Sequence, residues 1–284
     1  MREELSTDEM STLLRDVGLL NLNRVVFTGG EPLLRNDIFT LGQTLHRAGA
    51  GQHRCITTNG TLITEHNAKA LAESFDEIRI SIDGFREVND ASRGGGTFDK
   101  AMSAFRHVRL AGGDPVASIT VTSLSLPRLK DFLGFLLRNG VSNLHISPLR
   151  LAGRAAEAQT ACNFGEVKRI VEEFWYDTFG RSLTTGMNKR SNCGVGRTVT
   201  VYPDGSVYPC HLLAFPEFCI GNVKKDGLAS IYNQSDLMNK LRNLNFNEIA
   251  LCTEYCKELP VEATCLGTLA QEVNFKEKLL NLLQ

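Results

Sequence analysis

Hydrophobic positions switch between two spacings from residue 6 to about residue 180. Short apolar or alternating segments predict five strands, at 24–28, 55–58, 77–82, 116–122 and 144–147. Apolar residues three and four apart follow the strands and predict helices, among them 98–110 and 164–179. A further helix is expected to begin at the capping box Ser6-Thr7-Asp8-Glu9. Between the third strand and residue 98 we expect a glycine-rich loop.

Strands that alternate with helices in units of about 20 residues predict a parallel sheet, wound as an open α/β fold or as a barrel. In both folds, ligand sites form where the strands end. Polar and glycine residues follow the first three strands at these points: Gly29, Gly30, Glu31, Pro32, Thr58, Asn59, Ser81 and Asp83. Each segment alone is consistent with an ordinary turn. Their placement on one rim of one sheet favours a ligand site.

The residue types on this rim suggest a ligand class. Gly29 and Gly30 allow close approach of the backbone, and Glu31 adds a carboxylate, so the first loop suits an ammonium group. Ser81 and Asp83 are two residues apart, project from the same face of their strand and suit a ribose diol. The sequence contains no phosphate-loop motif. An amino-acid-bearing nucleoside therefore fits better than a nucleotide phosphate.

The last third of the chain is rich in cysteine. Six of the eight cysteines lie there: Cys193, Cys210, Cys219, Cys252, Cys256 and Cys265. Alternating residues at 197–202 and 207–211 flank a turn and predict a hairpin with a cysteine at each end. Clustered thiols select zinc or an iron–sulfur cluster, and their spacing alone does not separate the two.

Charge and composition narrow the possible partners. Lys plus Arg (31) nearly cancels Asp plus Glu (32), which disfavours a strongly basic nucleic-acid surface. No apolar run reaches the roughly 18 residues that span a bilayer, and the charged start of the chain does not resemble a secretion signal. We therefore expect a cytoplasmic protein without nucleic-acid or membrane partners. His145, inside the fifth strand, is expected to be a hydrogen-bonded interior histidine.

The motifs resemble those of radical S-adenosylmethionine (SAM) enzymes in several places and in the same order. Residues 27–35 are similar to the GGEP segment of that family, and residues 57–60 and 80–84 to its next two strand ends. The resemblance implies a partial (βα)6 TIM-like barrel over 1–185, with the first strand missing. It also implies that Gly29, Gly30, Glu31 and Pro32 receive the methionine amino group of SAM. Thr58, Asn59, Ser81 and Asp83 would then lie near the ribose and carboxylate of SAM.

Residues 186–284 resemble the SPASM or twitch extension, a small cysteine-rich domain that holds auxiliary 4Fe–4S clusters, here with a β-hairpin and a C-terminal helix. The spacing Cys193-x11-Gly205-x4-Cys210 is similar to its beginning, whereas Cys252-x3-Cys256-x8-Cys265 departs from a complete SPASM ending. Six thiols favour one auxiliary cluster over two. The resemblance implies metal ligands among Cys193, Cys210, Cys252, Cys256 and Cys265, and zinc at the same thiols is the alternative.

The function implied by the resemblance is oxidoreductase-type chemistry that modifies or matures a peptide or protein through a 5'-deoxyadenosyl radical. A flavodoxin- or ferredoxin-type reductant would be a further partner. The 284 residues contain no CxxxCxxC segment, which holds the radical SAM 4Fe–4S cluster in the family. We therefore expect an N-terminally truncated enzyme, inactive as written, that holds this cluster only if the missing segment is supplied. The alternative is a non-catalytic iron–sulfur or zinc scaffold that binds a peptide or partner protein.

Overall fold

The computed structural model describes residues 4–20, 22–48, 53–149, 162–180, 194–244, 270 and 273–283. The chain divides into two compact units. The first draws on residues 17–149 and 159–183, and the second on 1–16, 150–158 and 184–284. None of the helices in the described ranges combines the length and the apolar character that crossing a bilayer requires.

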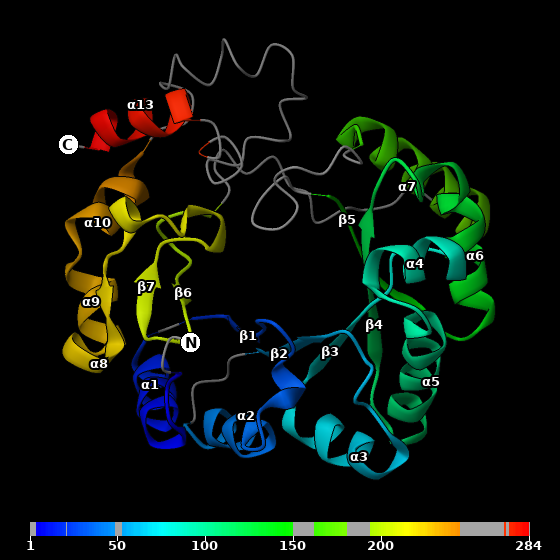
Figure 1. The fold of residues 1–284 in the computed structure, drawn as a ribbon, viewed down its shortest axis with the longest axis horizontal. Helices are drawn as coiled ribbons and strands as arrows, with labels where there is room; N and C mark the ends of the chain where they lie inside the picture. Colours follow the sequence, from blue (N-terminus) through cyan, green and yellow to red (C-terminus); the bar gives the residue numbers. More distant parts are fainter. Residues whose placement is uncertain are drawn as a thin grey trace. The chain divides into compact units, whose positions relative to one another are not determined.

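The first unit is built on a five-stranded parallel sheet in the sequential order β1-β2-β3-β4-β5 (Figure 1). The strands are β1 (Arg24–Phe27), β2 (His53–Thr58), β3 (Glu77–Ser81), β4 (Pro115–Val121) and β5 (Asn143–Pro148). This confirms the five predicted strands and their parallel pairing. A sequential order is typical of a barrel, whereas a doubly wound sheet reverses its order at a switch point.

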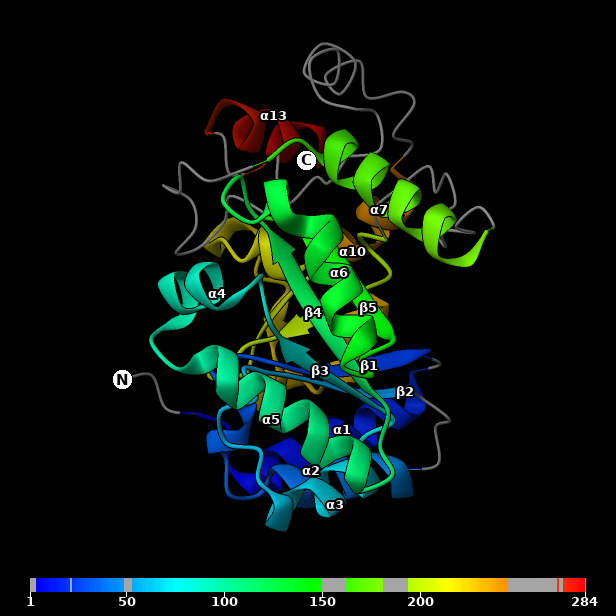
Figure 2. The same ribbon diagram turned by 90° about the vertical axis from the view of Figure 1, so that its right-hand side faces the viewer.

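Helices cover one face of this sheet. They are α2 (Ile38–Arg47), α3 (Glu65–Ser74), α5 (Thr97–Leu110), α6 (Leu129–Arg138) and α7 (Phe164–Phe179), with the short helices η1 (Pro32–Leu34) and η2 (Leu126–Arg128). Figures 1 and 2 show α5 and α6 along the strands on this side. Strand residues at alternate positions are apolar and almost completely buried: Ile56, Ile78, Ile80, Ala117, Ile119 and Val121. Burial of each larger side chain contributes about 1.5–3 kcal/mol, so this layer is the core of the unit.

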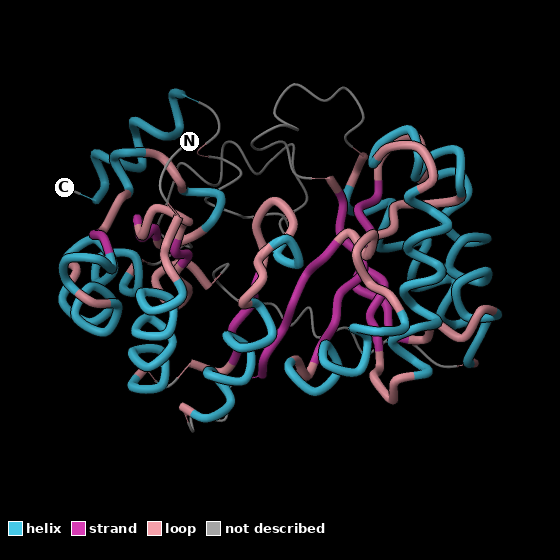
Figure 3. Tube along the Cα trace, turned by 60° about the horizontal axis from the view of Figure 1, so that its bottom comes forward, coloured by secondary structure: helices cyan, strands magenta, loops and turns pink. Residues whose placement is uncertain are grey.

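The opposite face of the sheet is polar. The strand register aligns on it Arg24, His53, Cys55, Glu77, Arg79, Ser81, Ser118, Thr120, His145 and Ser147, together with the apolar Val26 and Val116. Figure 3 shows these strands side by side. A parallel sheet that is buried on both faces is hydrophobic on both, so this composition indicates a face that meets water or a polar ligand. His145 is exposed there, because β5 is the last strand of the sheet, and the expectation of an interior histidine is wrong.

The segment expected to be a glycine-rich loop contains a helix, α4 (Arg86–Arg93), so that prediction is wrong over these residues. The sequence of α4 is mostly polar and has no apolar stripe that would predict a helix. Side-chain hydrogen bonds hold it instead. Asn89 is completely buried, accepts from the backbone N–H of Asp83 at 3.1 Å and donates to Thr97 Oγ1 at 3.0 Å.

The second unit contains a three-stranded antiparallel sheet of β6 (Thr200–Val201), β7 (Ser206–Tyr208) and β8 (Gly221–Asn222). The predicted hairpin is confirmed in β6 and β7, and its turn uses Gly205 at φ +86°. The third strand has two residues, too few for a recognisable pattern. Around the sheet lie η4 (His211–Leu213), η5 (Pro216–Phe218), α8 (Val223–Asp226), α9 (Leu228–Gln234), α10 (Asp236–Asn243) and the expected C-terminal helix α13 (Val273–Leu283).

The core of the second unit is formed by Val195, Leu213, Phe218, Leu241, Ala270, Leu279 and Leu283. Helix α1 (Thr7–Leu19) begins at the predicted capping box, in which Ser6 Oγ accepts from the N–H of Glu9 at 3.2 Å and the Glu9 carboxylate accepts from the N–H of Ser6 at 2.8 Å. The Asp16 carboxylate accepts from the N–H of Leu228 at 2.8 Å. This last bond ties the C-terminal half of α1 to the start of α9.

Candidate functional site at the carboxyl ends of the strands

Glu31 joins two of the predicted strand-end loops. Its carboxylate accepts from Thr58 Oγ1 at 2.6 Å, from the N–H of Asn59 at 2.8 Å and from the N–H of Leu33 at 3.2 Å. The last bond caps η1, which begins at Pro32 because proline suits the first turn of a helix. The structure therefore brings Glu31, Thr58 and Asn59 together, with the Glu31 carboxylate at the centre.

The glycines before Glu31 are open to solvent. A Cβ atom added to Gly29 or Gly30 would meet no atom within 4 Å, and Gly29 has φ +150°. A ligand can therefore approach the backbone of this turn closely. The loop after β2 has no such space. At Gly60, with φ +76°, an added Cβ would lie 2.8 Å from Ile80 Cγ2, so glycine is needed there to pack the loop on the sheet.

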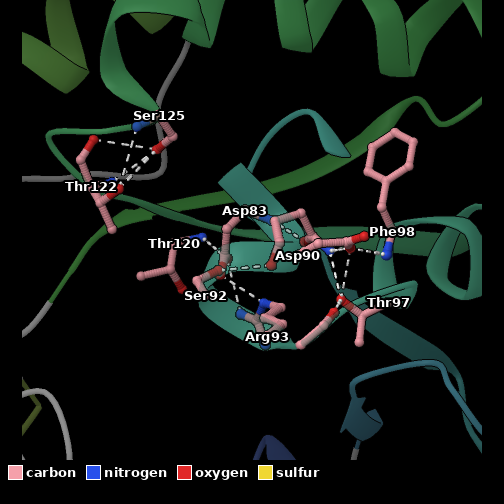
Figure 4. A network of polar contacts seen from close by, with 11 residues as sticks. Asp83, Asp90, Ser92, Arg93, Thr97, Phe98, Thr120, Thr122 and Ser125 are labelled. Atoms are coloured by element: carbon pink, nitrogen blue, oxygen red, sulfur yellow. Dashed lines mark hydrogen bonds and ion pairs between the residues drawn. The ribbon is translucent and has the colours of Figure 1, made fainter. Parts of the chain in front are cut away.

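Asp83 lies at the centre of a separate network (Figure 4). Its carboxylate receives two hydrogen bonds from Arg93, at 2.6 and 2.9 Å, and one from the backbone N–H of Thr120 at 3.0 Å. Asp83 is almost completely buried. These bonds tie the end of β3 to α4 and to the end of β4. The carboxylate is thus engaged within the protein, while Ser81, two residues earlier, is half-buried on the polar face and aligned with Ser118.

One of the five predicted metal ligands lies in the described part of the chain. Cys210 follows β7 and is half-buried, with its sulfur 3.9 Å from Nδ1 of His211. The predicted ligands outside the described residues are Cys193, Cys252, Cys256 and Cys265. Within the described ranges no three His, Cys, Asp or Glu side chains gather into a metal site. The thiol of Cys210, at the end of a hairpin, is a donor that suits iron or zinc.

A charged cluster on the polar face was not anticipated from the sequence. Glu77 accepts from Arg24 and Arg79, and lies 2.9 Å from Nε2 of His53. Burial alone would raise the pKa of Glu77, but the hydrogen bonds of Arg79 and His53 outweigh it and hold this pKa below its usual value. The signal that could have revealed the cluster is the alternation Glu-Ile-Arg-Ile-Ser along β3, which puts Glu77, Arg79 and Ser81 on one face.

The fold and the strand-end loops define a partial (βα) barrel with a candidate ligand site at the carboxyl edge of the sheet. Residues 2–136 match the radical SAM superfamily, and residues 193–257 match the SPASM family, an iron–sulfur cluster-binding domain. The chain is 31% identical over 261 residues to mycofactocin maturase MftC of Mycolicibacterium smegmatis. The alignment covers 84% of this chain and 65% of that relative. It is 30% identical over 260 residues to mycofactocin maturase MftC of Mycobacterium ulcerans, covering 84% and 69%.

A similar fold is seen in Streptococcus suis SuiB bound to S-adenosylmethionine. The TM-score is 0.73 at 16% identity, over 95% of this chain and 67% of that one. This chain belongs to the radical SAM superfamily and carries a SPASM domain. The two families imply 4Fe–4S clusters and SAM as cofactors. The chain spans 65% of the length of the M. smegmatis relative.

Proposed function

We propose that this chain binds SAM and an auxiliary cluster and acts as a maturase that modifies a peptide or protein. The observation that carries the proposal is the Glu31 bridge: one carboxylate fixes two strand-end loops and leaves the Gly29–Gly30 turn open beside them. Two kinds of relative support the peptide substrate. The MftC proteins are named as maturases, and SuiB has been crystallised with the precursor peptide SuiA.

Each residue of the site has a role in this proposal. The open backbone of Gly29 and Gly30 receives the ammonium group of SAM, and Glu31 keeps that turn in place. Thr58 and Asn59 hold Glu31, and the hydroxyl of Ser81 binds the ribose. Asp83 is a positioning residue, because Arg93 and Thr120 already engage its carboxylate. When bound, SAM would supply a 5'-deoxyadenosyl radical for hydrogen abstraction from the substrate, after one-electron reduction by a 4Fe–4S cluster and release of methionine.

The SPASM domain would hold one auxiliary cluster. Its thiolates are drawn from Cys193, Cys210, Cys252, Cys256 and Cys265. A flavodoxin- or ferredoxin-type protein is the reductant that this chemistry needs, and the cytoplasm, where thiols stay reduced, is its compartment.

SAM binding by the anaerobically purified chain tests the proposal. Binding rather than turnover is measured, because the 284 residues contain no CxxxCxxC segment. Gly30→Val places a side chain in the open space beside the turn and is expected to weaken SAM binding at least tenfold. Gly95→Val is the matched control, since its added Cβ also meets no atom within 4 Å and Gly95 lies in another loop. Absence of SAM binding, or equal effects of the two substitutions, would contradict the proposal.

Metal analysis of the same preparation tests the cluster. Iron and inorganic sulfide in equal amounts are expected, at about four of each for every chain. Zinc without sulfide would contradict the cluster and favour a zinc scaffold that binds a peptide or partner protein.

A further inference from the structure

Two arginines share one carboxylate on the polar face of the sheet. Nη2 of Arg24 donates to one oxygen of Glu77 at 2.5 Å, and Nε of Arg79 donates to the other oxygen. The three residues come from β1 and β3, with β2 between them. Two positive charges therefore face one negative charge, which leaves these three side chains with a net charge of about +1.

The neighbouring titratable groups do not supply the second negative charge. The sulfur of Cys55 lies 3.7 Å from Glu77, but burial raises the pKa of this thiol to about 11, so it remains neutral at physiological pH. Of the carboxylates near the strand ends, Asp83 is paired with the cation of Arg93, whereas Asp114, just before β4, accepts from the neutral amide of Asn143. Protonation of a histidine on this face would only add positive charge.

Arg79 keeps hydrogen-bond donors for a ligand. In the part of the chain that the structure describes, its hydrogen bond leaves from Nε, and no residue accepts from Nη1 or Nη2. The Arg79 side chain is 16% exposed, so these nitrogens are reachable but partly withdrawn from water. An ion pair in such a position is stronger than one on the open surface. The strand register aligns His145 on β5 with Ser118 and Ser81, two residues along from the row that contains Arg79. Desolvation of the imidazole and the charge of Arg79 lower the pKa of His145.

We propose that this face binds a carboxylate group of the peptide substrate, with the terminal nitrogens of Arg79 as its main donors and with His145 on the same face, two strands away. A guanidinium matches a carboxylate with two parallel hydrogen bonds. Arg79 lies two residues before Ser81 on the same face, toward the middle of β3, so the subsite adjoins the residues assigned to SAM. The peptide nature of the ligand rests on the proposed function, whereas the affinity for a carboxylate rests on the charges described here.

The pKa of His145 is the readout, because a carboxylate on Arg79 offsets the charge that lowers it. It is measured by NMR titration of the intact chain, with His145→Gln to assign the signal among the six histidines. Acetyl-Ala-Ala offers an α-carboxylate, acetyl-Glu-Ala-amide a side-chain carboxylate and acetyl-Ala-Ala-amide neither. We expect one or both of the carboxylate peptides at millimolar concentration to raise the pKa of His145 by about 0.5, and which of them does so identifies the source. The amide should have no effect.

Variants at Arg79 give a second test. Arg79→Gln should abolish the response, and Arg79→Lys, which keeps the charge, should retain part of it. Equal responses to the amide and the acids, or no response to any peptide, would overturn the proposal, and these comparisons need no variant to fold. An equal response to SAM alone would also overturn it, because the carboxylate would then be that of SAM. If the pKa of His145 does not respond to the carboxylate peptides but the chain binds SAM, only the carboxylate subsite is refuted. If the chain does not bind SAM, the proposed function is contradicted.

Discussion

The hydroxyl of Thr58 donates a 2.6 Å hydrogen bond to the carboxylate of Glu31, across the ends of two neighbouring strands. Thr58 is 2% exposed, so water cannot replace this donor if it is removed. The bond also leaves Thr58 Oγ1 free to accept from the N–H of Gly60 at 3.1 Å. A single hydroxyl therefore connects the Glu31 loop with the turn after β2.

Thr58→Val removes the hydroxyl but keeps the shape of the side chain. We expect the free energy of unfolding to fall by about 1–3 kcal/mol, because the half-buried carboxylate of Glu31 loses one donor and the buried N–H of Gly60 loses its acceptor. Urea unfolding measures the change. Thr57→Val is the control, since the Thr57 side chain makes no hydrogen bond with any of the described residues. A loss in Thr58→Val no larger than that of the control would contradict the role of the bridge.

Arg93→Met leaves the Asp83 carboxylate buried without its cation. Breaking a buried ion pair by removing one partner costs about 3–5 kcal/mol. We expect a loss at the lower end of this range, since Asp83 keeps the N–H of Thr120 as a donor. Arg86→Met, at an exposed pair with Asp99, should leave stability nearly unchanged. Thermal unfolding of the two variants decides the matter: similar melting temperatures would show that the Asp83 network is not structural.

The pair of Arg54 and Asp76 predicts a pH dependence of stability. The hydrogen bonds of Arg54 hold the pKa of Asp76 below its ordinary value of 3.8. A lowered carboxyl pKa stabilises the fold above the unfolded value, and this contribution is lost as the pH falls through the folded value. Asp76→Asn should therefore destabilise the chain at pH 6, and the difference from the parent should shrink as the pH falls below 3.8.

Denaturant unfolding at several pH values measures that difference. Asp131→Asn, at an exposed carboxylate on α6, serves as the control. A difference between the parent and Asp76→Asn that is independent of pH would show that the Arg54 bonds are not responsible.

Cys55 should resist alkylation in the folded chain. It is completely buried and its pKa is raised to about 11, so about one thiol in a thousand is a thiolate at pH 8. Mass spectrometry after iodoacetamide treatment should find Cys55 unmodified in the native chain and modified in guanidinium chloride. The exposed Cys219 provides the comparison. Modification of native Cys55 as fast as in denaturant would show that this side chain is not buried in the folded chain.

The strands and most helices of the first unit could be predicted because their patterns are local. The apolar residues of α6 recur every three or four positions, and β4 alternates strictly. The partners of polar residues could not be predicted, because they lie far apart in the sequence: Thr58 is 27 residues from Glu31, and Arg24 is 53 from Glu77. Helix α4 escaped prediction because polar contacts stabilise it, and polar contacts have no period.

The location of the candidate site could be predicted from sequence, whereas the partners of its side chains could not. Glycines and turn residues at strand ends identified the rim, since the chain direction alone puts those ends together. Sequence could not tell that Arg93 and Thr120 engage Asp83, which changes its proposed role from ligand contact to positioning. The role of four cysteines at the cluster stays a prediction, because Cys193, Cys252, Cys256 and Cys265 lie outside the described residues.

The polar face of the sheet has a thermodynamic consequence. A ligand that binds Arg79, Ser118 and their neighbours replaces hydrogen bonds between these side chains and water, and it buries little apolar surface. Burial of apolar surface is what makes the heat capacity change of binding strongly negative. Association on this face should therefore show an enthalpy that varies little with temperature, unlike the packing of the helices on the other side of the same strands.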